Sequence, residues 1–374
     1  MSDATARIER VALVSPYALS VPGGVQTQVR AMARSLSGRG YDVTVCSPGV
    51  VDEELVAEGV AHAAVGAVVS LPANGSRAPI TFSPRAVRAF RSIAATLRAG
   101  VVHVHEPFAP VAAYGILRDH RRPIVATFHR GGGGPAYRIG RPVIARLSSS
   151  LDVVVAVSER AAATIEAGSS LRPEVLFNGI DLAAVDAAAP WPTTAPTVLF
   201  VGRHEERKGL GVLLEAMSAL EMPIECWIVG KGPLTDSLRQ RFASDARLRW
   251  IGACGDDETR ARMRGADVLC VPSLGGESFG LVPLEGMAAR TAVVASDIDG
   301  YREATAGHTT LVAPSDPSAL AAALRAAIER PAPARVLDAA RAHAASWSVD
   351  ALMDRYVELY AEATRRFGER RAVG

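Results

Sequence analysis

Short apolar runs rich in β-branched residues alternate with Ala- and Leu-rich stretches along most of this chain. This alternation restricts the fold more than any other feature, because it is typical of parallel α/β domains in which a helix follows each strand. In the first half we expect strands at Val11–Ser15, Asp42–Cys46, Val101–His105, Pro123–Phe128, Asp152–Val157 and Glu174–Leu176, and helices at Val25–Ser37, Pro84–Arg98 and Glu159–Ala167.

The same alternation restarts in the second half. Leu182 to Pro196 is rich in Ala, Pro and Thr and predicts a linker. The strands expected after it are Thr197–Val201, Ile224–Val229, Leu248–Ile251, Val268–Val271, Ala292–Ala295 and Thr310–Val312.

A chain of 374 residues exceeds what one hydrophobic core usually supports, so two domains are expected. We predict an α/β protein with two Rossmann-like domains facing an interdomain cleft. The first domain would span residues 1–185 and the second residues 186–348. A final helix over residues 349–374 would pack back on the first domain.

Composition narrows the function classes. The net charge of +2 argues against nucleic acid as a partner, because nucleic-acid proteins need a broad basic surface. Three of the four cysteines, Cys46, Cys226 and Cys270, lie in or beside expected strands and predict buried reduced thiols. No apolar run reaches the roughly 18 residues needed to span a bilayer, and the N-terminus lacks a signal-peptide core. A cytoplasmic location is expected, and the oligomeric state is left open.

The sharpest chemical signal is a glycine-rich loop with two carboxylates. Gly275-Gly276-Glu277-Ser278-Phe279-Gly280 is followed by Glu285, and seven residues separate the two glutamates. Glycines let the backbone approach a ligand, and the helix start near Leu281 offers free N–H groups to phosphate or sugar oxygens. The alternative for an isolated Glu-x7-Glu pattern is a solvated loop residue and a surface helix residue.

A second signal directly follows the expected strand Thr197–Val201. The loop runs from Gly202 to Gly209 and contains Arg203 and Lys208. In a doubly wound domain, a loop after the first strand faces the ligand crevice, and fixed cations there stabilise negative charge on a departing diphosphate. We interpret Glu205, Glu206 and Arg207 in the same loop as solvated residues.

Weaker signals lie in the first half. Pro22-Gly23-Gly24 opens a helix and suits close approach to a pyrophosphate, although no dinucleotide fingerprint is present. His129 ends a strand and is expected to face the crevice, whereas His103 is expected to pack in the core. Asp297-Ile298-Asp299 is interpreted as a loop or helix-capping feature rather than a metal site.

Together these segments resemble the retaining GT-B glycosyltransferases of family 4, over nearly the whole chain. The likeness is strongest to the actinobacterial members that begin phosphatidylinositol mannoside synthesis. The segments that carry it are VSPYALSVPGGVQ, PANGS, VVHVHEPFAP, VATFH, FNGID, GRHEERKG, IVGKG, LGGESFG with Glu285, AVVASDID and the helix after Trp347.

The resemblance implies the activity and a role for each matching residue. A hexose, mannose from GDP-mannose as the best match, would pass to phosphatidyl-myo-inositol or a related lipid acceptor, with no required metal and no cofactor. His129 would contact the sugar near its reacting face, and Glu277 would bind its hydroxyls. Arg203 and Lys208 would hold the pyrophosphate.

The remaining implied residues divide between donor and acceptor. The donor site would include Gly24, Cys254, Asp256, Ser278, Phe279, Gly280 and Glu285. The acceptor site would include Tyr17, Gln26, Asn74 and Arg77. The chain departs from the pattern at Arg290, which takes the place of a glycine.

A basic segment raises the question of membrane contact. Between Glu58 and Glu106 no acidic residue occurs, and Arg85, Arg88 and Arg91 gather on one side of the expected helix after Pro84. Such a face could bind anionic phospholipid at the inner face of the plasma membrane, each basic residue adding about 1 kcal/mol near the surface. The alternative is an ordinary amphipathic helix whose apolar side lies in the core.

Two other functions fit the same residues. One is the same fold with a UDP-sugar donor and a soluble acceptor, such as an inositol phosphate or a natural product. The other is a nucleotide-dependent epimerase or a binding-only protein on this architecture. The sequence leaves the base, the sugar and the acceptor open.

Overall fold

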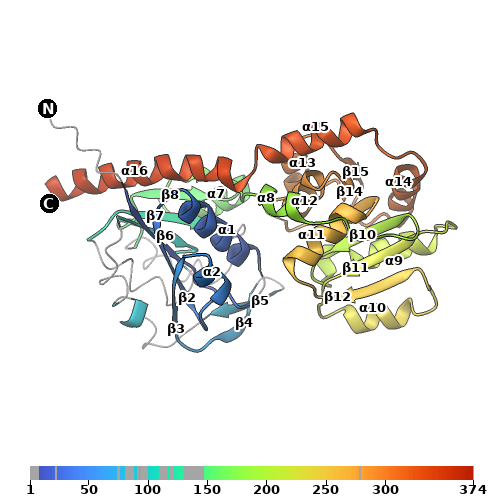
Figure 1. Ribbon diagram of the computed structural model, residues 1–374, viewed down its shortest axis with the longest axis horizontal. Coiled ribbons are helices and arrows are strands. Elements are labelled where there is room, and N and C mark those ends of the chain that lie inside the picture. The colour runs from blue at the N-terminus through green and yellow to red at the C-terminus, as the bar shows by residue number, and fades with distance from the viewer. Residues whose placement is uncertain are drawn as a thin grey trace. The chain divides into compact units, whose positions relative to one another are not determined.

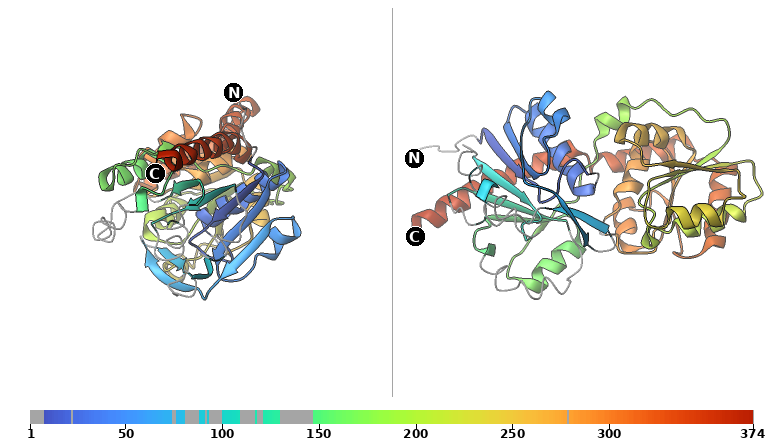
Figure 2. Two further views of the ribbon diagram at one scale, coloured as in Figure 1. Left: turned by 90° about the vertical axis from the view of Figure 1, so that its left-hand side faces the viewer. Right: turned by 90° about the horizontal axis from the view of Figure 1, so that it is seen from below.

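The computed structural model divides the chain into two compact units (Figure 1, Figure 2). It describes residues 8–21, 23–73, 76–80, 88–90, 92, 100–108, 117, 121–129, 147–277 and 279–373, with the backbone alone for 69–73, 76–80 and 373. The first unit comprises Met1–Gly179 and Val349–Gly374, and the second Ile180–Ser348. The chain thus passes between the units six residues before the boundary expected after residue 185.

The first unit is built on a parallel sheet of seven strands in the order β3-β2-β1-β6-β7-β8-β9. Their bounds are β1 Arg10–Val14, β2 Asp42–Pro48, β3 Ala61–Val65, β6 Val101–His105, β7 Ile124–Phe128, β8 Val153–Ala156 and β9 Glu174–Val175. An antiparallel pair, β4 Val69–Ala73 and β5 Ser76–Ile80, stands apart from this sheet. The described helices are α1 Gly24–Gly38, α2 Glu53–Ala57, α7 Glu159–Gly168 and α16 Val349–Val373.

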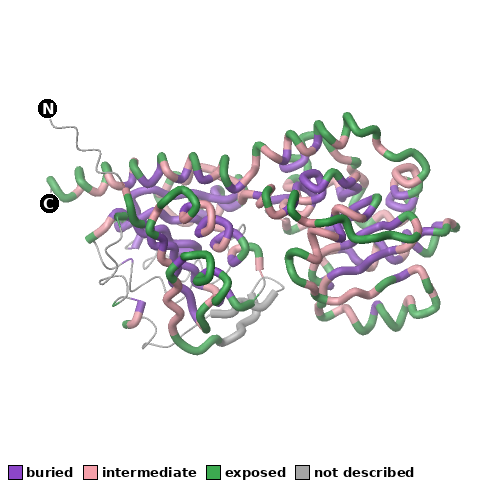
Figure 3. The backbone as a smooth tube through the Cα atoms, viewed as in Figure 1, coloured by how far each residue is buried: buried purple, intermediate pink, exposed green. Residues whose placement is uncertain are grey.

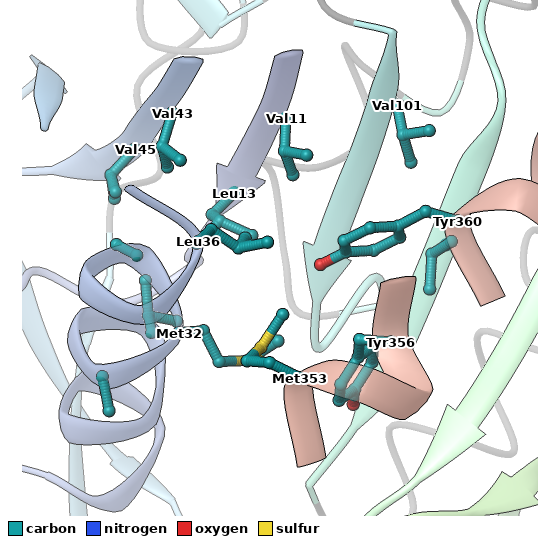
Figure 4. Packing of buried hydrophobic residues seen from close by; sticks show 14 of the residues in the cluster. Val11, Leu13, Met32, Leu36, Val43, Val45, Val101, Met353, Tyr356 and Tyr360 are labelled. Carbon is teal, nitrogen blue, oxygen red and sulfur yellow. The ribbon is translucent and has the colours of Figure 1, made fainter. Parts of the chain in front are cut away.

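Helices α1 and α16 cover one face of the first sheet. Alternate strand residues such as Val11 and Leu13 point to this face, because successive side chains of a strand lie on opposite sides. Met32 of α1 and Met353 of α16 complete the same core (Figure 4). Arg355 of α16 also pairs with a glutamate of β9. The last helix therefore belongs to the core of the first unit.

The second unit holds a parallel sheet of six strands in the order β12-β11-β10-β13-β14-β15. Its strands are β10 Thr197–Val201, β11 Glu225–Val229, β12 Leu248–Gly252, β13 Val268–Val271, β14 Ala292–Ser296 and β15 Thr310–Val312. Its helices are α8 Leu182–Ala187, α9 Leu210–Ser218, α10 Thr235–Arg241, α11 Asp256–Gly265, α12 Leu281–Ala288, α13 Asp299–Thr305, α14 Pro317–Glu329 and α15 Ala334–Ala345, with a short 3-10 turn at Glu206–Lys208.

Both sheets reverse their strand order beside the first strand, β1 in one and β10 in the other, as doubly wound Rossmann-like domains do. The central strands of each sheet are mostly buried on both faces, whereas the edge strands β3, β9, β12 and β15 are partly exposed (Figure 3). The prediction of two Rossmann-like domains is confirmed. The three predicted buried thiols are also confirmed as free and buried, and burial raises the pKa of Cys46 and of Cys226 to about 12.

The predicted linker is partly wrong, because Leu182–Ala187 forms helix α8. The Asp181 side chain accepts a hydrogen bond from the backbone N–H of Ala184 and so caps the helix start. Alanines favour the helix, and Val185 is buried against the second unit. Only residues 188–196 lack a regular element.

Arg290, which the sequence places where a glycine is usual, adopts a left-handed backbone with φ of 62°. It follows the end of α12 at the position where glycine commonly terminates a helix. Its guanidinium pairs with Asp338 at 2.6 Å. The exchange for glycine thus keeps the backbone conformation and adds a surface ion pair.

Gly209 offers a test of the second unit's architecture. Its φ is 67°, and a Cβ at this position would lie 1.9 Å from the carbonyl oxygen of Pro272. We expect Gly209→Ala to lower the free energy of unfolding by about 2 kcal/mol or more, from the left-handed strain and the clash. Gly38→Ala, with open space around it, should leave the thermal midpoint unchanged or slightly raised. Equal midpoints for the two variants would contradict this account.

Candidate functional site

Two loops meet at the switch point of the second sheet. One follows β10 and spans residues 202–209, and the other follows β13 and spans residues 272–280. Because β10 and β13 are hydrogen-bonded neighbours in a parallel sheet, both loops leave the same edge side by side. Open α/β sheets bind ligands at this point of the edge.

Ion pairs connect the two loops. The carboxylate of Glu277 accepts hydrogen bonds at its Oε1 from Lys208 Nζ at 2.8 Å and from Arg207 Nη1 at 2.7 Å. Glu205 uses both of its oxygens: Oε1 lies 2.7 Å from Arg203 Nε, and Oε2 lies 3.2 Å from Arg207 Nε. The charged side chains of the two loops therefore form one network.

The network shows that one interpretation was wrong. The sequence pattern predicts that Glu205 and Arg207 are solvated, yet the Glu205 side chain is only 6% exposed and joins two guanidinium groups. Glu206 alone matches that interpretation, being exposed. Both partners of Glu205, Arg203 and Arg207, lie two positions away in the same loop.

This arrangement suits a ligand with an anionic group next to hydroxyls. Lys208 and Arg203 supply positive charge, and Glu277 supplies acceptor oxygens within hydrogen-bond distance of the Lys208 ammonium. A carboxylate accepts from hydroxyl donors, and an ammonium donates to phosphate oxygens. The structure thus brings together three residues that the sequence singled out.

The second glutamate of the motif lies farther along α12. Glu285 is half-buried, and burial raises its pKa to about 7, a shift that Arg260 opposes and Asp256 enhances. Asp256 begins α11 and lies 4.0 Å from Arg260. Cys254, just before this helix, lies with its Sγ 3.4 Å from the hydroxyl oxygen of Thr259. These residues form a second group around the start of α11.

Close packing fixes the turn between Glu277 and α12. A Cβ on Gly280 would lie 2.8 Å from the Cβ of Ala304, so this position accepts glycine alone without rearrangement. Phe279 is buried, and its ring meets that of Trp347 edge-on at 5.7 Å. Ser278 lies outside the described residues. The loop is therefore anchored on both sides of Glu277, by its ion pairs and by this packing.

In the first unit, His129 lies at the end of β7 and is held from two sides. Its Nε2 lies 2.9 Å from Nδ1 of His105, and its backbone N–H donates to the carboxylate of Glu106. Glu106 has a φ of 45°, an uncommon backbone conformation for a residue other than glycine. Burial lowers the pKa of His129 to about 3, so its imidazole is neutral at physiological pH.

The start of α1 carries the other expected residues of the first unit. Gly24 is its first residue, a Cβ there would meet nothing within 4 Å, and no side chain caps the helix. Its first N–H groups are therefore available to an anion. Gln26 is buried and Tyr17 is half-buried.

Several other expected site residues lie outside the part of the chain that the structure describes with side chains. Asn74, Arg85 and Arg91 fall outside the described residues, and Arg77 lies on β5, described by its backbone alone. Arg88 is exposed. The face on which these arginines are expected to gather therefore stays a prediction.

Among the described residues, no group of three His, Cys, Asp or Glu side chains could hold a metal ion. Asp297 and Asp299 both pair with Arg302, at 2.5 Å and 2.8 Å. Asp299 lies in the first turn of α13, where a negative charge is favoured. The loop part of the interpretation is confirmed for Asp297, whereas the helix-capping part is wrong, because no side-chain hydrogen bond caps α13 within the described residues.

Comparison with known proteins agrees with this geometry. A family model described as Glycosyltransferase Family 4 matches residues 22–184, and one described as Glycosyl transferases group 1 matches residues 195–330. The phosphatidyl-myo-inositol mannosyltransferase of Mycobacterium leprae is 36% identical over 374 aligned residues, covering 96% of this chain and 92% of the relative. The protein of the same name from Mycolicibacterium smegmatis is 38% identical, covering 86% and 85%.

A solved structure shows the same fold at low identity. The glycosyltransferase from Rickettsia africae superposes with a TM-score of 0.73 at 20% identity, covering 95% of this chain and 98% of that one. Two Rossmann-like units with these loops at a switch point define an enzyme of the GT-B glycosyltransferase class. The chain belongs to the family 4 glycosyltransferases.

Glu285 generates a prediction about pH. Its pKa rises from 4.5 to about 7 on folding, so the folded state binds the proton more tightly than the unfolded state. The free energy of unfolding contributed by this group should therefore fall as pH rises from 4.5 to about 7, by at most about 3 kcal/mol.

Glu285→Gln should remove this decline, which chemical denaturation at a series of pH values would measure. Glu329→Gln, at an exposed carboxylate that ends α14, is the matched control and should keep the wild-type slope. A wild-type slope in Glu285→Gln would contradict the assignment.

Proposed function

We propose that this enzyme transfers mannose from GDP-mannose to phosphatidyl-myo-inositol, with retention of configuration at the anomeric carbon. Relatives with this activity in their names share 36% and 38% of aligned residues with the chain and match most of its length. That similarity is the observation that carries the proposal.

The ion-pair network supports the donor half of the proposal. In a nucleotide sugar the transferred sugar is bonded directly to the diphosphate. A site for it must therefore place phosphate-binding cations beside an acceptor of sugar hydroxyls. Lys208 and Glu277 meet this requirement, because their charged atoms lie 2.8 Å apart. Arg203 would bind the diphosphate together with Lys208, and Glu285 the ribose.

The cations would act mainly as the leaving group departs. When the bond from the anomeric carbon to the phosphate oxygen breaks, negative charge grows on the diphosphate. One charge pair at ~4 Å contributes about 4 kcal/mol at an effective dielectric near 20. Even part of this, if it develops only in the transition state, raises the rate by orders of magnitude.

The acceptor hydroxyl would attack the anomeric carbon from the same face of the sugar from which the leaving group departs. The new bond joins the acceptor oxygen to the anomeric carbon, and the hydroxyl proton passes to the leaving phosphate. Retention follows from this front-face path. His129 would contact the sugar and Gly24 the donor phosphate, and Tyr17, Gln26, Asn74 and Arg77 would serve the acceptor. No step requires a metal ion or a cofactor.

Access to a lipid acceptor would come from peripheral contact with the inner face of the plasma membrane. Within the described residues no helix has both the length and the apolarity to cross a bilayer. Arg85, Arg88 and Arg91 are the residues we propose for contact with anionic phospholipid.

A transfer assay that crosses donors with acceptors tests the proposal. We expect product from GDP-mannose with phosphatidylinositol vesicles, detected as a mannosylated lipid by mass spectrometry. UDP-glucose and UDP-galactose, and free inositol phosphate as acceptor, should give at least tenfold less. Preferential turnover of a UDP-sugar with inositol phosphate would instead establish the soluble-acceptor alternative.

Lys208 gives a sharper test of the donor site. We expect Lys208→Gln to lower kcat/KM for the donor by about 100- to 1,000-fold, because a cation that stabilises the departing diphosphate is lost. Arg239→Gln, at an exposed cation on α10, is the control and should change kcat/KM less than twofold. Matched kinetics for the two variants would exclude Lys208 from the reaction.

A further inference from the structure

A row of hydrogen-bonded side chains connects the C-terminal helix α16 with the strands that lead to His129. The Tyr360 hydroxyl lies 2.9 Å from Nδ1 of His103, and Nε2 of His103 lies 2.7 Å from Oγ1 of Thr127. The Tyr356 hydroxyl contacts the same Oγ1 at 2.8 Å. All four side chains are at most 2% exposed, so bulk water does not compete for these bonds.

The row lies where the sheet face that packs against α16 changes from apolar to polar side chains. On β6, Val101 is followed on the same face by His103 and His105, and on β7 Val125 is followed by Thr127. The valines belong to the apolar core that also holds the rings of both tyrosines (Figure 4). The polar residues are those nearest the carboxyl ends of the strands.

Holding α16 in place does not require these polar groups. Apolar side chains dock a helix well, and replacing a buried hydrogen-bonded pair by apolar groups of similar shape is often nearly neutral for stability. Buried polar networks do, however, fix the orientation of their members, since a misplaced partner leaves an unsatisfied group. The row is therefore better suited to orienting the strand ends than to adding stability.

Ring stacking continues the row to His129. The His103 and His105 rings stack with centroids 4.4 Å apart and 25° between their planes. The His105 and His129 rings follow at 5.2 Å and 28°, with the hydrogen bond from Nδ1 to Nε2 between them. His105 thus contacts the rings of both other histidines.

This contact leaves a particular atom of His129 for a ligand. Its Nε2 is engaged by His105, whereas its Nδ1 is buried and has no hydrogen-bond partner within the described part of the chain. Burial lowers the pKa of all three histidines, so each ring carries one proton. If His105 donates from Nδ1, the proton of His129 resides on Nδ1 and can be donated to a ligand oxygen.

We propose that α16 positions His129: the Tyr356 and Tyr360 hydroxyls, through Thr127, His103 and His105, fix its ring so that Nδ1 meets the sugar. His103 and His105 are positioning residues in this scheme, and His129 alone touches the substrate. The inference rests on the proposed role of His129 in the transferase reaction.

Two substitutions of His105 test the positioning role against simple packing. Asn carries an amide N–H near the place of Nδ1 and can retain the bond to His129, whereas Leu fills the space without it. We expect His105→Asn to keep kcat within about threefold of wild type and His105→Leu to lower it at least tenfold, because small misplacement of a sugar contact costs rate. Better activity of the Leu variant would show that packing alone matters and would overturn the proposal.

The tyrosines test the contribution of α16. Tyr356→Phe/Tyr360→Phe removes two hydroxyl groups and keeps both rings in the core. We expect kcat to fall about tenfold while donor KM stays within twofold, because the residues proposed to bind the diphosphate are untouched. Tyr41→Phe is the control, because Tyr41 packs against the same core and none of the hydrogen bonds of the row uses its hydroxyl. Wild-type kcat in the double variant would overturn the proposal.

A spectroscopic arm separates this inference from the proposed function. Imidazole nitrogen NMR on histidine-labelled protein needs no substrate and reports which ring nitrogen holds the proton. The double tyrosine variant should shift the signals of His105 and His129 as well as His103, and Tyr41→Phe should leave all three in place. A change confined to His103 would refute the coupling. Wild-type protein that transfers no mannose would refute the proposed function, while these shifts would still decide whether α16 orients His129.

Discussion

When a parallel sheet is buried on both faces, its functional residues lie mainly at the edge where the strands end. Both units obey this constraint. Their central strands are mainly apolar, so most charged residues lie at the strand ends, on the partly exposed edge strands or in the loops. The reversal of strand order beside β1 and β10 then separates the loops and opens room for a ligand. The candidate residues therefore occur at these edges, beyond the buried apolar strands.

The two units use opposite electrostatics at their edges. In the second unit, Glu205 and Glu277 neutralise part of the charge of three neighbouring cations, which holds those side chains in place and leaves a net positive charge. In the first unit, burial keeps the imidazoles neutral, so they can orient hydroxyl groups without adding charge. A sugar joined to a diphosphate presents both needs within one molecule.

Sequence patterns predicted the two-domain α/β fold and the positions of nearly all strands, because period and composition are local properties. They also located Lys208 and Glu277, which glycines and a helix start mark in the chain. They missed the roles of Glu205 and Arg207, because the pattern does not show that Glu205 is buried between two arginines, and because Glu277, the other partner of Arg207, lies in a different loop. The contact of His103 with Tyr360 could not be predicted from local patterns either, because 257 residues separate the two in the sequence. Sequence patterns locate residues whose position depends on their own loop, strand or helix. Roles that depend on tertiary contacts require the structure.

The return of α16 to the first unit has a consequence for biosynthesis. Met353, Tyr356 and Tyr360 belong to the same core as β1, yet they are synthesised after the whole of the second unit. The second unit has all of its strands and helices before α16 is made, and can complete its core first. Domains usually fold in the order of their synthesis. The first unit therefore cannot complete its core until α16 has been made, after the whole of the second unit.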